Sequence, residues 1–262
     1  MDYGQPVPER PPSTLPPPGN LAIRLELGSR IGHGRTSDVY EVAIDVSNSS
    51  SELASLTFPP MVLKLSRSGR NKAMENEAYF YEEMELLQGI VIPRYYGFFK
   101  GEIPPDCVLA GESTASGLEY ETDCSHSVSG QGQAGNKQSF DGPRQVCILL
   151  IEKLGGTLPV GQRLPVELDI ELLEMYSHLS LLGIDHVDIR HANILEAPLC
   201  PPGWPGLVSP RTNYGYRYRF IDFDNSLKTD RPMYVFNTYY RQYVHRLLGG
   251  LPLGYVIEPW EH

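Results

Sequence analysis

The chain lacks any long apolar run. Its longest purely apolar stretch, Cys147–Ile151, is far shorter than the roughly 20 residues that a helix needs to cross a bilayer. The N-terminus also lacks the basic segment and apolar core of a secretory signal, and runs into prolines instead. We therefore expect no membrane partner, and a protein of the cytoplasm or nucleus that is not secreted.

Cysteine is scarce, and no pair of cysteines has C-x-x-C spacing. Zinc sites and disulfide frameworks depend on closely patterned cysteines, so neither is expected. The four cysteines are Cys107, Cys124, Cys147 and Cys200. Histidine offers no alternative metal site, because His178, His186 and His191 do not share one helical face at i, i+4 spacing. A G-x-S-x-G motif is absent as well, which excludes the usual nucleophile elbow of a hydrolase.

Positive charge is in deficit, with 22 Lys and Arg against 32 Asp and Glu and a net charge of −10. Binding to a nucleic-acid backbone requires clustered cations, so no nucleic-acid partner is expected. The interleaved Tyr and Arg residues of 214–219 also occur in RNA-stacking strands, but the acidic charge favours an ordinary two-faced strand. A nucleotide remains possible, since it needs only a local cation and a metal ion.

Glycine and proline are plentiful, with 25 and 23 residues, and they divide the chain. Residues 1–20 hold seven prolines and predict a disordered tail. We expect an N-terminal unit at 21–154 with a disordered insertion at about 106–142, and a C-terminal unit at 155–262 with a Pro/Gly-rich insertion at about 197–215.

Hydrophobic periodicity predicts an α+β fold. Alternation or short apolar runs predict strands at 23–27, 39–44, 61–65, 94–99, 145–152 and 216–223. Helical spacing of apolar residues predicts helices at 71–88, 165–182 and from 233 to 247.

Several polar residues stand where the pattern expects apolar ones. Lys64 lies inside an apolar strand, where it must either extend to water or meet an anion. Glu77 falls on the buried stripe of its helix and needs a partner, for which Lys64 is the simplest candidate. Gly32 and Gly34 lie between two strands, as in a plain hairpin turn or in a loop that lets backbone N–H groups approach phosphates.

The segment 184–195 carries a carboxylate, a cation and an amide in fixed order, as Asp188, Arg190 and Asn193. Asp222 then interrupts an apolar and aromatic strand. Two separated carboxylates and an asparagine are oxygen donors that suit a hard cation such as Mg²⁺. Taken singly, Asp188 and Asp222 are equally compatible with turn residues that cap their own backbone.

Taken in order, these features resemble the protein-kinase-like superfamily: a Gly-rich turn, a strand lysine, a helical glutamate, an apolar strand into Gly155-Gly156, then H-x-D-x-x-x-x-N and I-D-F. The chain is most similar to the short kinase-domain proteins of fungi, over about residues 27–226. The resemblance implies an α+β, two-lobed protein-kinase-like fold, with an antiparallel N-lobe sheet plus one long helix and a reduced helical C-lobe.

The same resemblance implies a nucleotide site made by the N-terminal half. Gly32 and Gly34 would cover the phosphates, and Lys64, held by Glu77, would contact the α- and β-phosphates. Ile151 to Leu154, which includes Glu152, would form the hinge that binds adenine.

It also implies a catalytic centre from the second half. Asp188 would be the catalytic base, Arg190 would contact the γ-phosphate, and Asn193 and Asp222 would hold Mg²⁺. The cofactors implied are ATP and Mg²⁺, with an unknown protein or small molecule as phosphate acceptor.

Three positions depart from the protein-kinase pattern. Ser37 replaces the third glycine, Val187 replaces the arginine before the catalytic aspartate, and Asp224 replaces the glycine of D-F-G. Asp at this last position resembles small-molecule kinases of the aminoglycoside and choline type.

The sequence therefore predicts a Mg- and ATP-dependent phosphotransferase. The alternative is a pseudokinase that acts as a nucleotide-binding or protein-interaction module. A third interpretation is an unrelated α+β interaction domain whose motifs match by chance.

Overall fold

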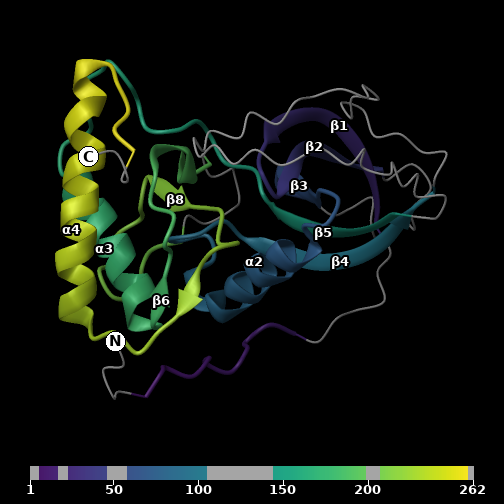
Figure 1. The fold of residues 1–262 in the computed structure, drawn as a ribbon, viewed down its shortest axis with the longest axis horizontal. Helices are drawn as coiled ribbons and strands as arrows, with labels where there is room; N and C mark the ends of the chain where they lie inside the picture. The colour runs from purple at the N-terminus through teal and green to yellow at the C-terminus, as the bar shows by residue number, and fades with distance from the viewer. Residues whose placement is uncertain (1–5, 17–22, 46–57, 105–143, 199–206, 259–262) are drawn as a thin grey trace, which may run out of the picture.

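The computed structural model describes residues 6–16, 23–45, 58–104, 144–198 and 207–258. The predicted insertion at about 106–142 lies outside these residues, and so does part of the Pro/Gly-rich stretch at 197–215. In the described ranges, no helix is both long and apolar enough to cross a membrane. The fold is mixed α/β, with an antiparallel sheet in the N-terminal half and helices on either side of the later loops (Figure 1).

Five strands form one antiparallel sheet in the order β1-β2-β3-β5-β4. They span Arg24–His33 (β1), Ser37–Asp45 (β2), Met61–Ser66 (β3), Tyr95–Ile103 (β4) and Arg144–Glu152 (β5). The first five of the six predicted strands are all present in this sheet, each extended at one or both ends by ladder pairing.

Strand β3 lies at the centre of the sheet and is buried along its whole length. Its side chains alternate between two apolar clusters, because successive residues of a strand point to opposite faces. Met61, Leu63 and Leu65 belong to the smaller cluster, whereas Val62 packs into the cluster that includes the helix α2. Lys64 shares the face of Val62 and is thereby directed toward α2.

Strand β1 is more exposed than its alternating sequence predicts. Leu27 and Ile31 are more than 40% exposed, and so is Ile23, directly before the strand. The reason is position: β1 pairs only with β2 at the edge of the sheet, so one side of the ladder and much of both faces meet solvent.

Helix α2 (Asn71–Glu83) packs its predicted apolar stripe against β4 and β5. Met74, Ala78 and Tyr81 are buried, and so is Glu77 between them. The predicted helix to Gln88 instead ends at Glu83 and continues as a tighter 3₁₀ turn, in which Leu87 N donates to Met84 O at 2.8 Å.

Helices α3 (Leu168–Leu181) and α4 (Met233–Gly250) pack against each other at the opposite end of the molecule from β1 (Figure 1). The ring of Tyr176 stacks between Phe220, at 4.2 Å between centroids, and Tyr240, at 4.4 Å. One continuous buried cluster joins these rings to α2 and β5. The sheet and the helical end therefore share a core.

Short ladders organise the loops between the helices. Strand β6 (Ile184–Asp185) pairs with β9 (Leu227–Lys228), and β7 (Ile194–Glu196) pairs with β8 (Tyr218–Phe220). The strand predicted at 216–223 is thus only three residues long. Tyr216 and Tyr218 are buried, so their rings offer no stacking platform for RNA.

Residues 6–16 contain neither helix nor strand, which agrees with their proline content. They nevertheless contact the end of α2: Arg10 pairs with Glu82 at 3.3 Å, and Thr14 N donates to Glu85 Oε1 at 2.8 Å. Disorder of the whole 1–20 tail remains a prediction for the residues that are not described.

Candidate functional site

A cleft of about 1300 Å³ opens between the β1–β2 hairpin, the strand β3, the linker after β5 and the loops that flank β7 and β9. Nine of the ten predicted site residues line it, and the tenth, Glu77, lies directly behind Lys64. The nine are Gly32, Gly34, Lys64, Glu152, Leu154, Asp188, Arg190, Asn193 and Asp222. The structure thus brings into one cavity residues that are up to 190 positions apart.

The glycines belong to the hairpin that closes one end of the cleft. Gly32 pairs with Val39 across β1 and β2, and a Cβ at Gly32 would lie only 3.2 Å from the Val39 side chain. Gly34 N donates to Ser37 O at 2.9 Å and closes the turn. The two glycines therefore belong to a hairpin turn that also lines the cleft.

Lys64 is buried and held by two carboxylates. Its Nζ lies 2.8 and 2.7 Å from the two oxygens of Glu77 and 3.0 Å from Asp222 Oδ1. The pairing with Glu77, which the buried stripe of α2 predicted, is present. Burial alone would lower the pKa of Lys64, but the adjacent carboxylates outweigh it and raise the pKa. Lys64 is therefore a permanent cation in the floor of the cleft.

In Glu77, the effect of burial on the pKa exceeds the effect of the neighbouring charge. Its burial raises its pKa to about 7, and the charge of Lys64 offsets this only in part. Removing the lysine would therefore leave a buried carboxyl group with no cation, which is a costly arrangement.

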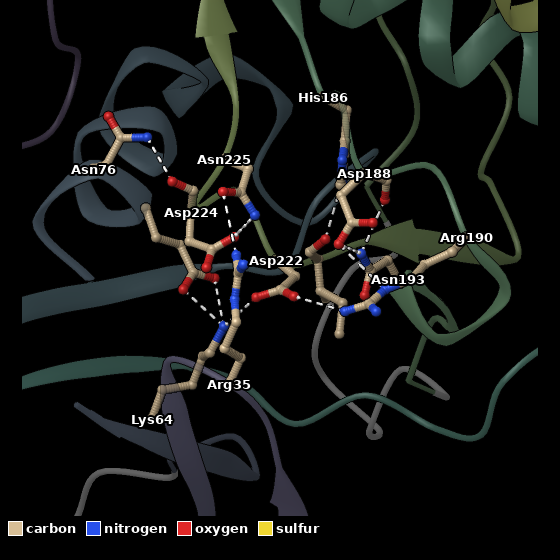
Figure 2. Close-up of polar contacts among 12 residues, drawn as sticks. Arg35, Lys64, Asn76, His186, Asp188, Arg190, Asn193, Asp222, Asp224 and Asn225 are labelled. Carbon is tan, nitrogen blue, oxygen red and sulfur yellow. Dashed lines mark hydrogen bonds and ion pairs between the residues drawn. The ribbon is translucent and has the colours of Figure 1, made fainter. Parts of the chain in front are cut away.

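Asp222 links the two sides of the cleft (Figure 2). Its Oδ1 accepts from Lys64 on β3, while its Oδ2 lies 3.5 Å from Arg190 Nη2 on the opposite loop. Burial alone would raise the pKa of Asp222, but the nearby cations, Lys64 foremost, lower it. Asp222 is thus ionised at neutral pH.

Asp188 lies beside Asn193 and Arg190 in the same loop (Figure 2). Asn193 Nδ2 donates to both the backbone O of Asp188, at 2.9 Å, and its Oδ2, at 3.0 Å. Arg190 Nε lies 3.2 Å from the same Oδ2. Because both donations use the amide nitrogen of Asn193, its Oδ1 is the atom left to face a ligand.

The backbone next to both aspartates adopts a conformation that side chains disfavour. Val187 has φ +65° and Asp222 has φ +69°, and for a β-branched residue such as valine this region is strained. Asp185 stabilises the first bend: its Oδ1 accepts from Val187 N at 3.2 Å and from the Tyr240 hydroxyl at 3.2 Å. Contacts in the buried core thus offset the backbone strain at Val187, the residue before Asp188.

Phe223 anchors the second aspartate from behind. Its ring packs between Tyr81 of α2, at 5.4 Å, and His186, at 4.6 Å. His186 Nε2 lies 2.9 Å from the backbone O of Ile221. These contacts fix the main chain on both sides of Asp222, and no local periodicity in the sequence indicated them.

His186 gives this region a pH dependence. Burial lowers the pKa of His186. Below about pH 6.5, His186 therefore binds a proton more readily in the unfolded chain than in the native chain. We expect the free energy of unfolding of the parent, relative to His186→Gln, to fall by up to about 1.4 kcal/mol per pH unit on acidification below 6.5. Urea titrations of both proteins between pH 7 and pH 5 measure this difference, and a difference that stays constant would contradict it.

Three polar residues that received no role from the sequence also meet here. Asn76, one residue before Glu77, donates to the backbone O of Asp224 at 2.8 Å, and Asn225 Nδ2 donates to Asp224 Oδ1 at 2.9 Å. Burial, reinforced by the charge of Asp222, raises the pKa of Asp224. The aspartate that replaces the glycine of D-F-G is therefore bonded by neutral amides at the rim, and the charges of Lys64 and Arg35 offset only part of the rise in its pKa.

Glu152 does not present its carboxylate to the cleft. That group binds Arg94, through the backbone N at 3.1 Å and through the guanidinium. Glu152 is 3% exposed, so only its main chain is available to a bound molecule. The acidic side chain instead fixes the start of the linker, which continues to Gly155, whose N donates to Glu196 O at 2.9 Å.

No three His, Cys, Asp or Glu side chains converge to form a metal site within the described ranges. The carboxylate of Asp222 and Oδ1 of Asn193, two residues that line the cleft, supply oxygen donors. Such a pair fits Mg²⁺ shared with the phosphates of a nucleotide, because this ion commonly takes one or two protein ligands and completes its shell with phosphate and water.

Comparison with known proteins gives a distant structural neighbour and no match by sequence. No protein-family model matches the chain, and no curated protein matches it either. Among solved structures, one neighbour is the crystal structure of a kinase domain, with 14% sequence identity and a TM-score of 0.44. The alignment covers 79% of this chain and 52% of that one. The chain thus spans about half the length of that kinase domain.

Proposed function

We propose that the chain is a Mg- and ATP-dependent phosphotransferase with a two-lobed, protein-kinase-like fold. The observation that carries the proposal is the network Glu77–Lys64–Asp222–Arg190–Asp188–Asn193, which is continuous across one cleft. A buried lysine, two carboxylates and an amide in this arrangement are the groups that phosphoryl transfer uses to hold phosphates and metal ions.

The two-lobed description assigns the sheet and α2 to the N-lobe and α3 and α4 to the C-lobe, with residues 152–156 as the connection. The C-lobe is reduced, because only residues 223–232 separate Asp222 from the start of α4. Ten residues leave no room for a long activation segment and a peptide-binding platform. This favours a compact acceptor, in line with the likeness to small-molecule kinases at Asp224.

The apolar part of the cleft supports a nucleobase. Its aliphatic side chains come from β1, β2, β3, the linker and β7, and a flat aromatic base fits between such walls. They belong to Ile31, Val39, Val62, Leu154 and Leu195. Beside them, the main chain of the linker offers hydrogen bonds, and the buried cation Lys64 lines the same cleft.

The polar part supports the chemistry of transfer. Bound magnesium would neutralise charge on the phosphates and hold them in line, and Asp222 and Asn193 Oδ1 are the donors suited to it. Asp188 accepts the proton of the acceptor hydroxyl. The hydroxyl oxygen of the acceptor then bonds to the γ-phosphorus, while the bond between the γ-phosphorus and the bridging oxygen of the β-phosphate breaks. Lys64 and Arg190 balance the negative charge that develops on the phosphate oxygens.

The second candidate is a pseudokinase that binds nucleotide or a protein without turnover. What favours it is that Asp188 Oδ2 is engaged by both Asn193 and Arg190, so its proton-accepting atom is partly occupied. An unrelated interaction domain would need no such buried network.

Two measurements on the same sample distinguish these candidate functions. Mg-dependent ATP turnover and ATP binding are measured on the full chain, with a panel of proteins, sugars, choline-like amines and aminoglycosides as acceptors. The enzyme binds and turns over ATP, a pseudokinase at most binds it, and an unrelated domain does neither.

A further inference from the structure

The tip of the β1–β2 hairpin carries an arginine that reaches across the mouth of the cleft. Arg35 follows Gly34 at the outermost point of the turn and lines the cleft. Its Nη2 lies 3.5 Å from Asn225 Oδ1, on the loop that holds Asp222 (Figure 2). The two residues are 190 positions apart, so the contact joins opposite walls.

The base of the hairpin is firmly held, although its tip is exposed. Asp38 accepts from His33 Nδ1 at 2.7 Å and pairs with Arg67 at 3.4 Å. Arg67 also donates to Gly34 O from its side chain, at 3.2 Å, and to Thr36 O from its backbone N, at 2.9 Å. These contacts position the backbone of Arg35 beside the cleft, while its side chain is exposed.

Arg35 differs from the other cations of the cleft in its partners. Lys64 is committed to Glu77 and Asp222, and Arg190 to Asp188 and Asp222. Within the described ranges, Arg35 forms no ion pair within 4 Å, although its charge acts on Asp224 from a greater distance. Its one hydrogen bond to another side chain goes to a neutral amide at the long limit of such bonds. A guanidinium is a planar fork of five donors that matches a terminal phosphate better than a single amide oxygen.

We propose that Arg35 binds the terminal phosphate of a nucleoside triphosphate, exchanging Asn225 for phosphate oxygens, and so selects triphosphate over diphosphate. This inference rests on the proposed function, because it places the phosphates between Lys64 and the hairpin. Lys64 lies deep beside β3 and Arg35 at the mouth, so the two cations contact opposite ends of the phosphate chain.

The test compares ATP and ADP binding by isothermal titration of the full chain in millimolar Mg²⁺. In the parent, ATP binds more tightly than ADP. In Arg35→Gln, we expect the ATP affinity to fall about tenfold while the ADP affinity stays within twofold of the parent, since a charged hydrogen bond to the last phosphate is lost. Arg35→Lys retains the charge without the fork and gives an intermediate loss.

The matched control is Arg24→Gln, on the same strand but at its far end, where Arg24 is exposed and pairs with Asp45. Both affinities should be unchanged there. Equal losses for ATP and ADP in Arg35→Gln would mean that the residue only shapes the hairpin, and unchanged ATP affinity would mean that it does not touch the nucleotide. Either result overturns the role of Arg35 and leaves the proposed function standing. Absence of nucleotide binding by the parent overturns both.

Discussion

Asp188→Asn is expected to abolish phosphoryl transfer while leaving ATP affinity nearly unchanged. An amide cannot accept the proton of the acceptor hydroxyl, and loss of a general base costs about 10²-fold or more in rate. The nucleotide should be retained, because Asp188 contacts neither Lys64 nor the linker, and Arg190 keeps its second partner, Asp222. Initial rates of ATP consumption with an acceptor, together with the ATP dissociation constant, measure the two effects separately.

Asp169→Asn is the matched control for this variant. It makes the same chemical change at an exposed position in the first turn of α3, so rate and affinity should both match the parent. If Asp188→Asn transfers phosphate as fast as the parent does, Asp188 is not the base. If it loses ATP affinity as well, the aspartate supports the nucleotide and the roles in this loop have to be reassigned.

The parts of this site that follow local periodicity were predictable from the sequence. The apolar run of β3 and the 3.6-residue period of α2 each identify one buried charged residue, Lys64 and Glu77, and burial requires that such charges find partners. The two side chains do meet. The α-helical spacing likewise identified the faces of α3 and α4 that carry Tyr176 and Tyr240.

The links across the cleft were not predictable in this way. Lys64 and Asp222 are 158 positions apart, and no local pattern relates them; only the order of the motifs placed them in one site. Arg35 was missed because a turn residue shows no periodicity, and its contact with Asn225 depends on how the whole hairpin is folded over the cleft.

Other differences arise from tertiary context. Glu152 stands in the predicted hinge, and its role toward a nucleotide stays a prediction that rests on its main chain. Its carboxylate meets Arg94, a contact that depends on how the chain folds around β5 and that no local pattern indicated. The alternation of β1 predicted burial on one face, yet the strand lies at the edge of the sheet. Sequence patterns report that a residue is suited to burial, whereas the neighbour that covers it is decided by the topology.

ATP with magnesium is expected to stabilise the parent against heat more than ATP with EDTA. A ligand that binds only the native state adds RT ln(1 + [L]/Kd), about 2.7 kcal/mol at a hundredfold excess over Kd, which raises the midpoint by roughly 5–10 °C for a domain of this size. The magnesium-dependent part should disappear in Asp222→Asn, because a neutral amide does not replace the charge of a carboxylate. Midpoints of thermal unfolding at millimolar nucleotide measure each part.

Lys64→Met should lower the response to ATP with or without metal, since the proposed role of the lysine is to contact phosphate directly. This substitution also leaves Glu77 and Asp222 without their shared cation, and breaking a buried pair on one side costs about 3–5 kcal/mol. Each variant therefore has to be compared with its own ligand-free midpoint.

The double variant Lys64→Met, Glu77→Gln separates stability from binding. With the glutamate neutral, less uncompensated charge remains beside α2, so the ligand-free midpoint should recover part of what Lys64→Met loses, while the ATP response should remain low. A double variant that regains the ATP response would show that Lys64 acts only through the fold. Equal midpoints for the parent with and without Mg-ATP would contradict both the phosphotransferase and the nucleotide-binding pseudokinase, because either must bind nucleotide to the native state and be stabilised by it.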